Sequence, residues 1–301
     1  MKIGVVGIGG IAQKAYLPVY SENRHQATFL FASSNPETRQ LLQANYQFQN
    51  VYGSIQEVLA EKPDGVMIHA ATKVHYQLAK TCLEAGVHVF MDKPLAESFQ
   101  ETEELLDLAK KRGVFLMAGF NRRFVPLVAN LKETADKHLL ILQKNRVNEP
   151  QPVRFVVYDL LLHLVDTAVY LLEEPVLNSE GQFLVQEGLL QQVHVRLTTA
   201  KTTAFLHMDL VGGANVEHYQ VTAASGQQNL SELIHLTSTS KQQRKEIRGN
   251  DWESTLHKRG FQPMIEAFLA AVATGDATNL RQANIRTSHQ ICEQLLQEAG
   301  Y

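Results

Sequence analysis

Several features that mark other classes of protein are scarce in this sequence. Only two of its 301 residues are cysteines, Cys82 and Cys292, which excludes a disulfide framework and a cysteine metal cluster. No apolar run approaches the roughly 18 residues that a membrane span needs. Lysine and arginine number 28 against 31 aspartates and glutamates, so the basic face that a nucleic-acid binder needs is missing. No signal segment precedes the first expected strand. We therefore expect a cytoplasmic protein that binds neither nucleic acid nor membrane.

Short apolar runs alternate with amphipathic stretches through the first part of the chain. This pattern predicts strands over 2–6, 28–32, 65–70, 87–91 and 114–119, and helices over 11–22, 36–45, 54–60, 75–85 and 98–111. Strands joined by crossover helices form a parallel sheet covered on both faces. The sequence therefore predicts an N-terminal α/β domain over 1–119 with a doubly wound, Rossmann-type parallel sheet.

The pattern changes after residue 119. Helices are predicted over 126–137, 159–172, 262–273 and 282–299, with one strand near 139–144 and a polar loop over 148–152. Between 181 and 248 one strand follows another, separated by turn residues. We predict a C-terminal α+β domain over 120–301, built on an open and largely antiparallel sheet.

A glycine-rich turn joins the first expected strand to the first helix. Gly7 allows the tight turn, Gly9 lets the backbone approach a pyrophosphate, and Ala12 permits close helix–strand packing. Gly10 and Ile11 open the helix, whose N-terminal N–H groups and partial positive charge favour phosphate. Alone, such a turn can be merely structural, but with several βα units behind it the pattern predicts a dinucleotide site.

The end of the second strand lacks the carboxylate that commonly binds the ribose 2′-hydroxyl of NAD. Ser33 and Ser34 stand there instead, and Arg39 follows one turn into the next helix. Hydroxyls and a guanidinium suit a 2′-phosphate, so we expect NADP in preference to NAD. The alternative is that this segment only caps its helix and that Arg39 is solvated.

Three polar residues share one face of an otherwise apolar helix in the second domain. Asp159, His163 and Asp166 stand at i, i+4 and i+7. Burying them is costly unless they are paired or used. Asp159 could be an N-cap and His163 a satisfied core histidine. Lys93 follows a parallel strand at its carboxyl end, where ligands of open α/β sheets bind. Its presence there favours a functional role for Asp159 and His163, whereas Asp166 is expected to be mainly structural.

Several motifs in order resemble those of the glucose–fructose oxidoreductase/inositol dehydrogenase (Gfo/Idh/MocA) family. Asp92-Lys93-Pro94 resembles its Glu-Lys-Pro motif, Thr72 to His75 its loop after the third main strand, and the Asp159–Asp166 helix its second-domain motif. The resemblance covers the whole chain. More narrowly, the segments 7–15, 119–124 and 259–261 resemble MviM-type oxidoreductases.

The resemblance implies hydride transfer between a nicotinamide cofactor and a carbinol carbon of a sugar or polyol-like substrate. His163 is then the general base, Lys93 binds the reacting oxygen, and Asp159 orients the substrate. It implies a cis bond between Lys93 and Pro94, substrate binding by the second domain, and a homodimer or homotetramer. No spacing of histidines or cysteines indicates a metal site. The residues expected to bind the cofactor are Gly7, Gly9, Gly10, Ile11, Ala12, Ser33, Ser34, Arg39, Ala70, Thr72, His75, Asp92, Lys93 and Asn121.

This sequence departs from the family pattern around the expected substrate site. Asp92 stands where the family has glutamate, and Arg154–Tyr158 replaces a glycine-rich turn before the Asp159 helix. Two other functions therefore stay open. One is an NADP-binding sensor or regulatory protein without turnover, and the other is a redox-assisted hydrolase or lyase that retains its cofactor.

Overall fold

A six-stranded parallel sheet organises the first of two units. In the computed structural model, which describes residues 1–301, this unit comprises Met1–Phe120 and Phe261–Gln282. The strand order is β3-β2-β1-β4-β5-β6, the order of a dinucleotide-binding fold. The strands are β1 Lys2–Val6, β2 Thr28–Ala32, β3 Val51–Tyr52, β4 Gly65–Ile68, β5 His88–Asp92 and β6 Leu116–Gly119. The doubly wound parallel sheet predicted from the sequence is confirmed.

Helices flank this sheet, and capping residues set several of their starts. Ser98 accepts a hydrogen bond from Glu101 N at the start of α5, and Gly113 ends that helix in the left-handed conformation. The segment predicted as one helix over 11–22 is a π-helical turn followed by an α-helix. The helices are η1 Ala12–Tyr16, α1 Leu17–Glu22, α2 Pro36–Ala44, α3 Ile55–Ala60, η2 Thr72–Val74, α4 His75–Glu84, α5 Phe99–Arg112, α10 Phe261–Thr274 and η5 Thr278–Leu280.

Helix α10 comes late in the chain but belongs to this first unit. Its Phe268 ring lies 5.8 Å from the ring of Phe90 on β5, and Phe261 lies edge-on to Tyr16 at 5.6 Å. The sequence placed the whole of 120–301 in the second domain, because the pattern of a helix does not indicate which sheet it packs on.

None of the helices combines the length and the apolar character that a membrane span requires.

The second unit, Asn121–Gly260 and Ala283–Tyr301, is built on a nine-stranded sheet. Its order is β15-β14-β13-β12-β7-β11-β10-β8, with β9 paired to β10, and every pairing is antiparallel except β7 with β11. The predicted open, largely antiparallel sheet is confirmed. The strands are β7 Lys137–Val147, β8 Gln151–Pro152, β9 Asn178–Gln186, β10 Leu189–Thr198, β11 Thr203–Gly212, β12 Val216–Ala223, β13 Gly226–Ser231, β14 His235–Ser240 and β15 Gln243–Arg248.

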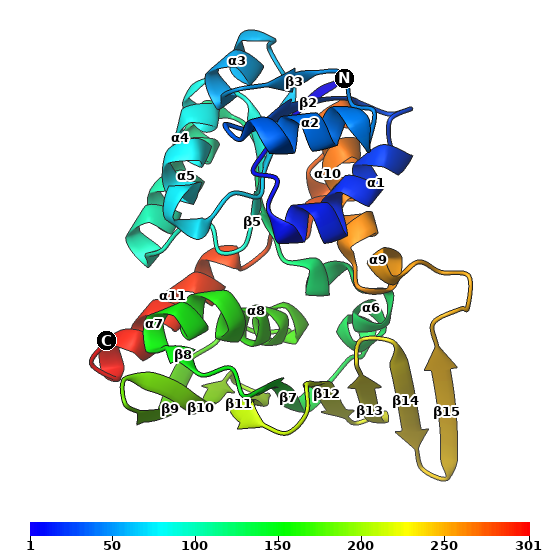
Figure 1. The fold of residues 1–301 in the computed structure, drawn as a ribbon. Coiled ribbons are helices and arrows are strands. Elements are labelled where there is room, and N and C mark those ends of the chain that lie inside the picture. Colours follow the sequence, from blue (N-terminus) through cyan, green and yellow to red (C-terminus); the bar gives the residue numbers. More distant parts are fainter. The chain divides into compact units, whose positions relative to one another are not determined.

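Helices lie on one face of this second sheet. Figure 1 shows α7, α8 and α11 on the same side of β7 to β11. Side chains alternate accordingly, so Leu140 and Leu142 of β7 are buried against the helices. The helices of this unit are η3 Asn121–Phe124, α6 Pro126–Glu133, α7 Val153–Val156, η4 Val157–Leu161, α8 Leu162–Leu171, α9 Thr255–Lys258 and α11 Ile285–Glu298.

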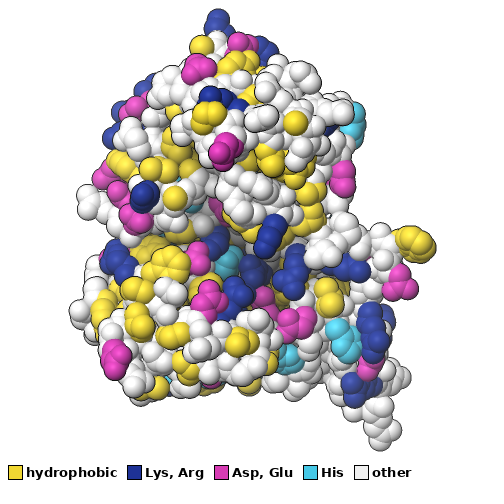
Figure 2. Space-filling view, in the orientation of Figure 1, with side chains coloured by type: hydrophobic (Ala, Val, Ile, Leu, Met, Phe, Trp, Pro, Cys, Tyr) yellow, Lys and Arg dark blue, Asp and Glu magenta, His cyan; other side chains and the backbone are white.

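The last two strands of the sheet form a charged hairpin. Figure 2 shows lysine, arginine and histidine side chains gathered over β14 and β15. Arg244 and Lys245 are exposed there, and Arg244 and Arg248 both approach Glu246. Exposed ion pairs of this kind contribute little to stability.

Two helix boundaries in this unit differ from the predictions by four residues or more. The helix predicted over 126–137 ends at Glu133, because Thr134 is extended and Asp136 has a φ of 52°, and Lys137 already starts β7. The helix predicted to begin at Asp159 begins at Val153, after Pro152 in extended conformation. The alternative interpretation of Asp159 as an N-cap is therefore wrong, because Asp159 lies inside the π-helical turn η4.

Candidate functional site

The glycine turn after β1 is fixed by a close backbone approach. Gly7 has a φ of +87°, and a Cβ on it would lie 2.3 Å from Ala70 N. A Cβ built on Gly9 or Gly10 meets nothing within 4 Å. The turn therefore packs tightly at Gly7 and is open at Gly9 and Gly10, at the start of the helix where backbone N–H groups favour a phosphate. The glycine cradle fits a dinucleotide pyrophosphate.

The loop after β2 holds an arginine close to two serines. Asn35 caps α2 by accepting from Glu37 N at 2.8 Å. Arg39 Nη1 donates to Ser33 O at 2.8 Å and to Ser34 O at 3.0 Å. The guanidinium is therefore drawn back onto the loop, whose residues 33–35 contain no carboxylate. Both the helix cap and the arginine–serine cluster are present.

Lys93 follows β5 at the same edge of the sheet as the glycine turn. In the register of the sheet Met91 pairs with Ile68, and Ile68 pairs with Val6, so the chain leaves all three strands at one edge. The Lys93–Pro94 bond is cis, as the family resemblance implies. Asp92 Oδ1 accepts from Lys93 N at 2.9 Å.

His75 joins two loops at this edge. Its Nδ1 lies 2.7 Å from Pro94 O, its Nε2 lies 2.8 Å from Ala70 O, and its side chain is buried. The ring thus bridges the turn that carries Lys93 to the backbone that packs against Gly7. Burial raises the pKa of Asp92, and the nearby Lys93 and His75 partly oppose that rise.

Histidine and tyrosine side chains fill the core beneath this edge. Tyr20 Oη lies 2.5 Å from His69 Nε2, and the Tyr16 ring stacks on His69 at 3.8 Å. Burial lowers the pKa of His69 to about 3, so the ring is neutral at physiological pH. His69 is therefore a core residue.

In the second unit, the helix with the Asp159 motif holds its three polar residues in different surroundings. Asp159 is half-buried, His163 is 8% exposed and Asp166 is fully buried. Arg123 Nε and Nη2 donate to the two oxygens of Asp166 at 2.9 and 2.7 Å, and Ser288 Oγ donates at 3.0 Å. Asp166 is thus committed to a buried, bidentate ion pair.

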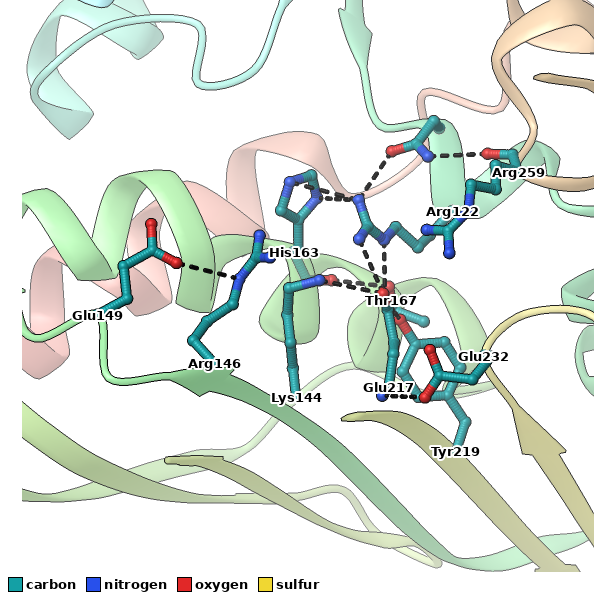
Figure 3. Close-up of polar contacts among 11 residues, drawn as sticks. Arg122, Lys144, Arg146, Glu149, His163, Thr167, Glu217, Tyr219, Glu232 and Arg259 are labelled. Carbon is teal, nitrogen blue, oxygen red and sulfur yellow. Dashed lines mark hydrogen bonds and ion pairs between the residues drawn. The ribbon is translucent and has the colours of Figure 1, made fainter. Parts of the chain in front are cut away.

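Arg122, one residue before that ion pair, contacts both His163 and a buried glutamate (Figure 3). Its Nε and Nη2 donate to Glu217 at 3.0 and 3.1 Å, and its Nη1 lies 3.2 Å from His163 Nδ1. A guanidinium only donates, so the imidazole nitrogen that it approaches accepts the bond. The amide of Asn121, expected to meet the cofactor, is engaged within this unit: it donates to Arg259 O and accepts from Arg122 Nη1.

Glu217 is the only carboxylate at the centre of this cluster. Lys144 Nζ donates to Glu217 Oε2 at 3.0 Å, and Tyr219 Oη donates to Oε1 at 2.5 Å. Burial raises the pKa of Glu217, but Arg122 and Lys144 outweigh it and hold that pKa well below its usual range. Burial lowers the pKa of Lys144 to about 8, with Arg122 adding to the effect and Glu217 opposing it.

The sequence reasoning missed Lys144, Glu217 and Tyr219. The alternation of side chains along each strand could have identified them. Glu217 and Tyr219 occupy the buried positions of β12. Lys144 occupies the next buried position of β7 after Leu140 and Leu142. A charged residue in a buried phase needs a partner or a function. Asn121 and His163 were named from the sequence, and the structure brings them together through Arg122.

Comparisons with known proteins agree with this architecture. Residues 1–120 match the family described as an oxidoreductase family with an NAD-binding Rossmann fold. YceM of Salmonella typhimurium, an oxidoreductase by name, is 31% identical over 90% of this chain and 89% of its own. A myo-inositol 2-dehydrogenase of Thermotoga maritima is 28% identical over 63% of this chain and 60% of its own.

Solved structures are similar over the whole chain. A Gfo/Idh/MocA family oxidoreductase from Vibrio cholerae has a TM-score of 0.91 at 31% identity, covering 99% of this chain and 98% of its own. A dehydrogenase (MviM) from Clostridium difficile has a TM-score of 0.90 at 26% identity, covering 99% of each chain.

Proposed function

The chain belongs to the Gfo/Idh/MocA family of oxidoreductases, and on that premise we propose that it is an NAD(P)-dependent dehydrogenase of a sugar or polyol-like substrate. One observation carries the proposal. The glycine cradle, open at Gly9 and Gly10, and the Lys93 turn lie at the same edge of the parallel sheet, joined by His75. An open α/β sheet binds its ligand at this edge.

We propose NADP as the preferred cofactor. Gly7, Gly9, Gly10, Ile11 and Ala12 would hold the pyrophosphate. Ser33, Ser34 and Arg39 would bind the 2′-phosphate, supported by the position of the Arg39 guanidinium on that loop. Ala70, Thr72, His75, Asp92 and Lys93 would line the nicotinamide end, and Asn121 remains a proposed cofactor contact.

The proposed catalytic residues are Lys93, Asp159 and His163. The bound nicotinamide would supply the hydride acceptor in oxidation and the donor in reduction. As the substrate carbon loses hydride, its hydroxyl loses a proton to His163 and becomes a carbonyl; in reduction His163 returns that proton. Lys93 would hydrogen-bond the same oxygen and stabilise its developing negative charge. Asp159 would orient the neighbouring hydroxyls.

The motif order along the chain supports this assignment, and so does the setting of His163. Its ring accepts a hydrogen bond from Arg122, as a neutral imidazole does, and this bond opens when that acceptor nitrogen takes the proton of the substrate hydroxyl. A small-molecule substrate agrees with the sugar and polyol dehydrogenases among the relatives.

For the assembly we propose a homodimer or homotetramer that forms through the helix-free face of the nine-stranded sheet, where Phe205 is 37% exposed. Light scattering on wild type and Phe205→Asp tests this proposal.

A single variant tests the catalytic proposal. Lys93→Met should abolish NADPH formation with every member of a sugar and polyol panel, while NADPH should still bind, as read from nicotinamide fluorescence. Lys110→Met, at an exposed position of α5, is the matched control and should behave as wild type. Turnover by Lys93→Met would refute the role of Lys93. Tight cofactor binding without turnover by the wild type would favour a sensor.

A further inference from the structure

In the second unit, two buried cationic side chains share a single buried carboxylate. The side chains of Arg122 and Lys144 are 10% and 7% exposed, and both bind the single carboxylate of Glu217. Arg146 extends from the same face of β7, two residues beyond Lys144 (Figure 3). We call Arg122, Lys144 and Arg146 the cationic cluster. Buried charges that lack a counter-charge are expensive, so a surplus of this kind indicates a missing anion.

Glu217 has no capacity left for a third cation. Its Oε1 accepts from Arg122 Nε and Tyr219 Oη, and its Oε2 accepts from Arg122 Nη2 and Lys144 Nζ. Two carboxylate oxygens offer about four acceptor positions, and these bonds use them. Glu217 therefore fixes Arg122 and Lys144 in place, and the charge that remains is available to a ligand.

Arg146 is the least satisfied member of the cationic cluster. The Arg146 side chain is 35% exposed, but its Nε is buried and has no hydrogen-bond partner. The nearest carboxylate, Glu149, is 3.9 Å from that nitrogen, and its side chain is 52% exposed. An ion pair of that length and exposure contributes little. Lys144 uses one of its three N–H donors on Glu217. Lys144 and Arg146 together thus offer unused donors to a bidentate anion.

Arg122 places the cationic cluster beside His163, the proposed proton-transfer group. Arg122 Nη1 lies 3.2 Å from His163 Nδ1 and its Nε and Nη2 lie on Glu217, so one guanidinium spans the distance between the imidazole and the carboxylate that anchors Lys144. Figure 3 shows the side chains of His163, Lys144 and Arg146 extending toward the same space from α8 and β7.

We propose that the cationic cluster is a subsite for an anionic group on the substrate, so that the preferred substrates are polyhydroxylated acids or their phosphorylated equivalents. This inference rests on the proposed function, since it names the substrate class of the same site. Lys144 and Arg146 bind the carboxylate or phosphate, Arg122 and Glu217 hold Lys144 in position, and His163 faces the hydroxyl to be oxidised. Neutral sugars leave the charge unneutralised and bind more weakly.

The protonation of Lys144 gives the subsite a pH dependence. Burial and the charge of Arg122 lower its pKa to about 8. The groups that face it are Arg122 on η3, Glu217 and Tyr219 on β12, Arg146 on its own strand and His163 on α8. A bound anion adds negative charge and raises the pKa of Lys144 again. Affinity for an acid should therefore fall above about pH 8, while affinity for a neutral sugar should not.

Equilibrium binding to the NADP-loaded protein tests the proposal without requiring turnover. D-glucuronate and D-gluconate are compared by calorimetry with D-glucose and myo-inositol, and D-glucose 6-phosphate distinguishes phosphate from carboxylate. We expect at least one anionic probe to bind ten times more tightly than its neutral counterpart. Lys144→Met and Arg146→Gln should each reduce that preference at least fivefold, and Lys245→Met, on exposed β15, should not change it.

The outcomes separate this inference from the proposed function. Neutral sugars that bind or turn over as well as the acids, or an acid preference unchanged in Lys144→Met, would overturn the subsite and leave the dehydrogenase standing. Failure of every anionic probe to bind a protein that binds NADP also overturns the subsite. Failure to bind NADP or NAD at all overturns the proposed function, and the acid preference of the cofactor-free protein then decides the subsite alone.

Discussion

The pair of Arg123 and Asp166 offers the sharpest test of how the second unit is held together. Their side chains are 0% and 1% exposed, and two hydrogen bonds of 2.9 and 2.7 Å join them. Arg123 Nη1 also donates to Ala283 O at 2.7 Å, which ties η3 to the start of the C-terminal segment. Asp166→Asn preserves the shape of the side chain but removes its charge and leaves the guanidinium uncompensated.

The expected loss is large because the charge cannot reach water. Removing one partner of a buried ion pair costs about 3–5 kcal/mol. Asparagine keeps one acceptor oxygen for Arg123, so we place Asp166→Asn near the lower limit, about 3 kcal/mol. For a unit of this size such a loss lowers the melting temperature by roughly 6–12 °C.

Thermal and urea unfolding followed by far-UV circular dichroism measure this loss. Asp251→Asn, at an exposed position, is the control and should stay within about 0.5 kcal/mol of wild type. The double variant Arg123→Met with Asp166→Leu removes both charges and should recover much of the loss. An Asp166→Asn protein as stable as the control would refute the reasoning, and so would a double variant no more stable than Asp166→Asn.

Three further predictions concern the cofactor turn, its specificity and the buried lysine. Gly7→Ala should weaken NADPH binding more than tenfold, because the new Cβ would lie 2.3 Å from Ala70 N at a φ of +87°. Arg39→Gln should lower the ratio of NADPH to NADH affinity by about 10–100-fold, since a charge-assisted hydrogen bond contributes about 1.5–3 kcal/mol. Burial lowers the pKa of Lys144 from 10.5 to about 8, so between these values the unfolded chain binds a proton that the folded chain does not. The free energy of unfolding of wild type relative to Lys144→Met should therefore increase from pH 8 to pH 10, by about 2 kcal/mol.

Fluorescence titrations check the first two predictions and urea unfolding at several pH values checks the third. Arg112→Gln, exposed at the end of α5, is the control for Arg39. Unchanged NADPH affinity in Gly7→Ala would show that the glycine turn does not hold the cofactor. An unchanged ratio in Arg39→Gln would favour the interpretation of residues 33–39 as a helix cap. A pH-independent difference for Lys144→Met would show that this lysine stays charged throughout.

Local signals were enough to predict the parallel sheet of the first unit, but not that α10 packs on it. Strands β1 and β2 have the predicted bounds, because short buried runs ended by turn residues leave little choice of register or length. The glycine turn was predicted because Gly7 needs a conformation that other residues rarely adopt. The glycine turn and the Lys93 turn lie at one edge of the sheet because parallel strands end at the same edge. The βα alternation of the sequence already implies this arrangement.

The cationic cluster could not be predicted in the same way. Arg122 meets Glu217 across 95 positions of sequence, and Lys144 meets Glu217 across 73. Their contact depends on β12 lying beside β7, and on β7 pairing in parallel with β11 within an otherwise antiparallel sheet. Strand order and register of this kind are not encoded in local periodicity. The positions of Lys144 and Glu217 along their strands indicated that each is buried, but not which residue each one pairs with.

Two consecutive arginines of η3 connect the structural residue of the Asp159 motif, Asp166, to its proposed catalytic residue, His163. Arg123 binds Asp166, and Arg122 binds Glu217 and His163, so two neighbouring arginines connect to residues three apart on α8. Asp166 fixes Arg123, and the short helix then fixes Arg122 against His163. A substitution of Asp166 should therefore disturb His163 without touching a substrate, and its loss of activity should follow its loss of stability. Variants of a catalytic residue such as Lys93 should lose activity at unchanged stability, which distinguishes the two roles by experiment.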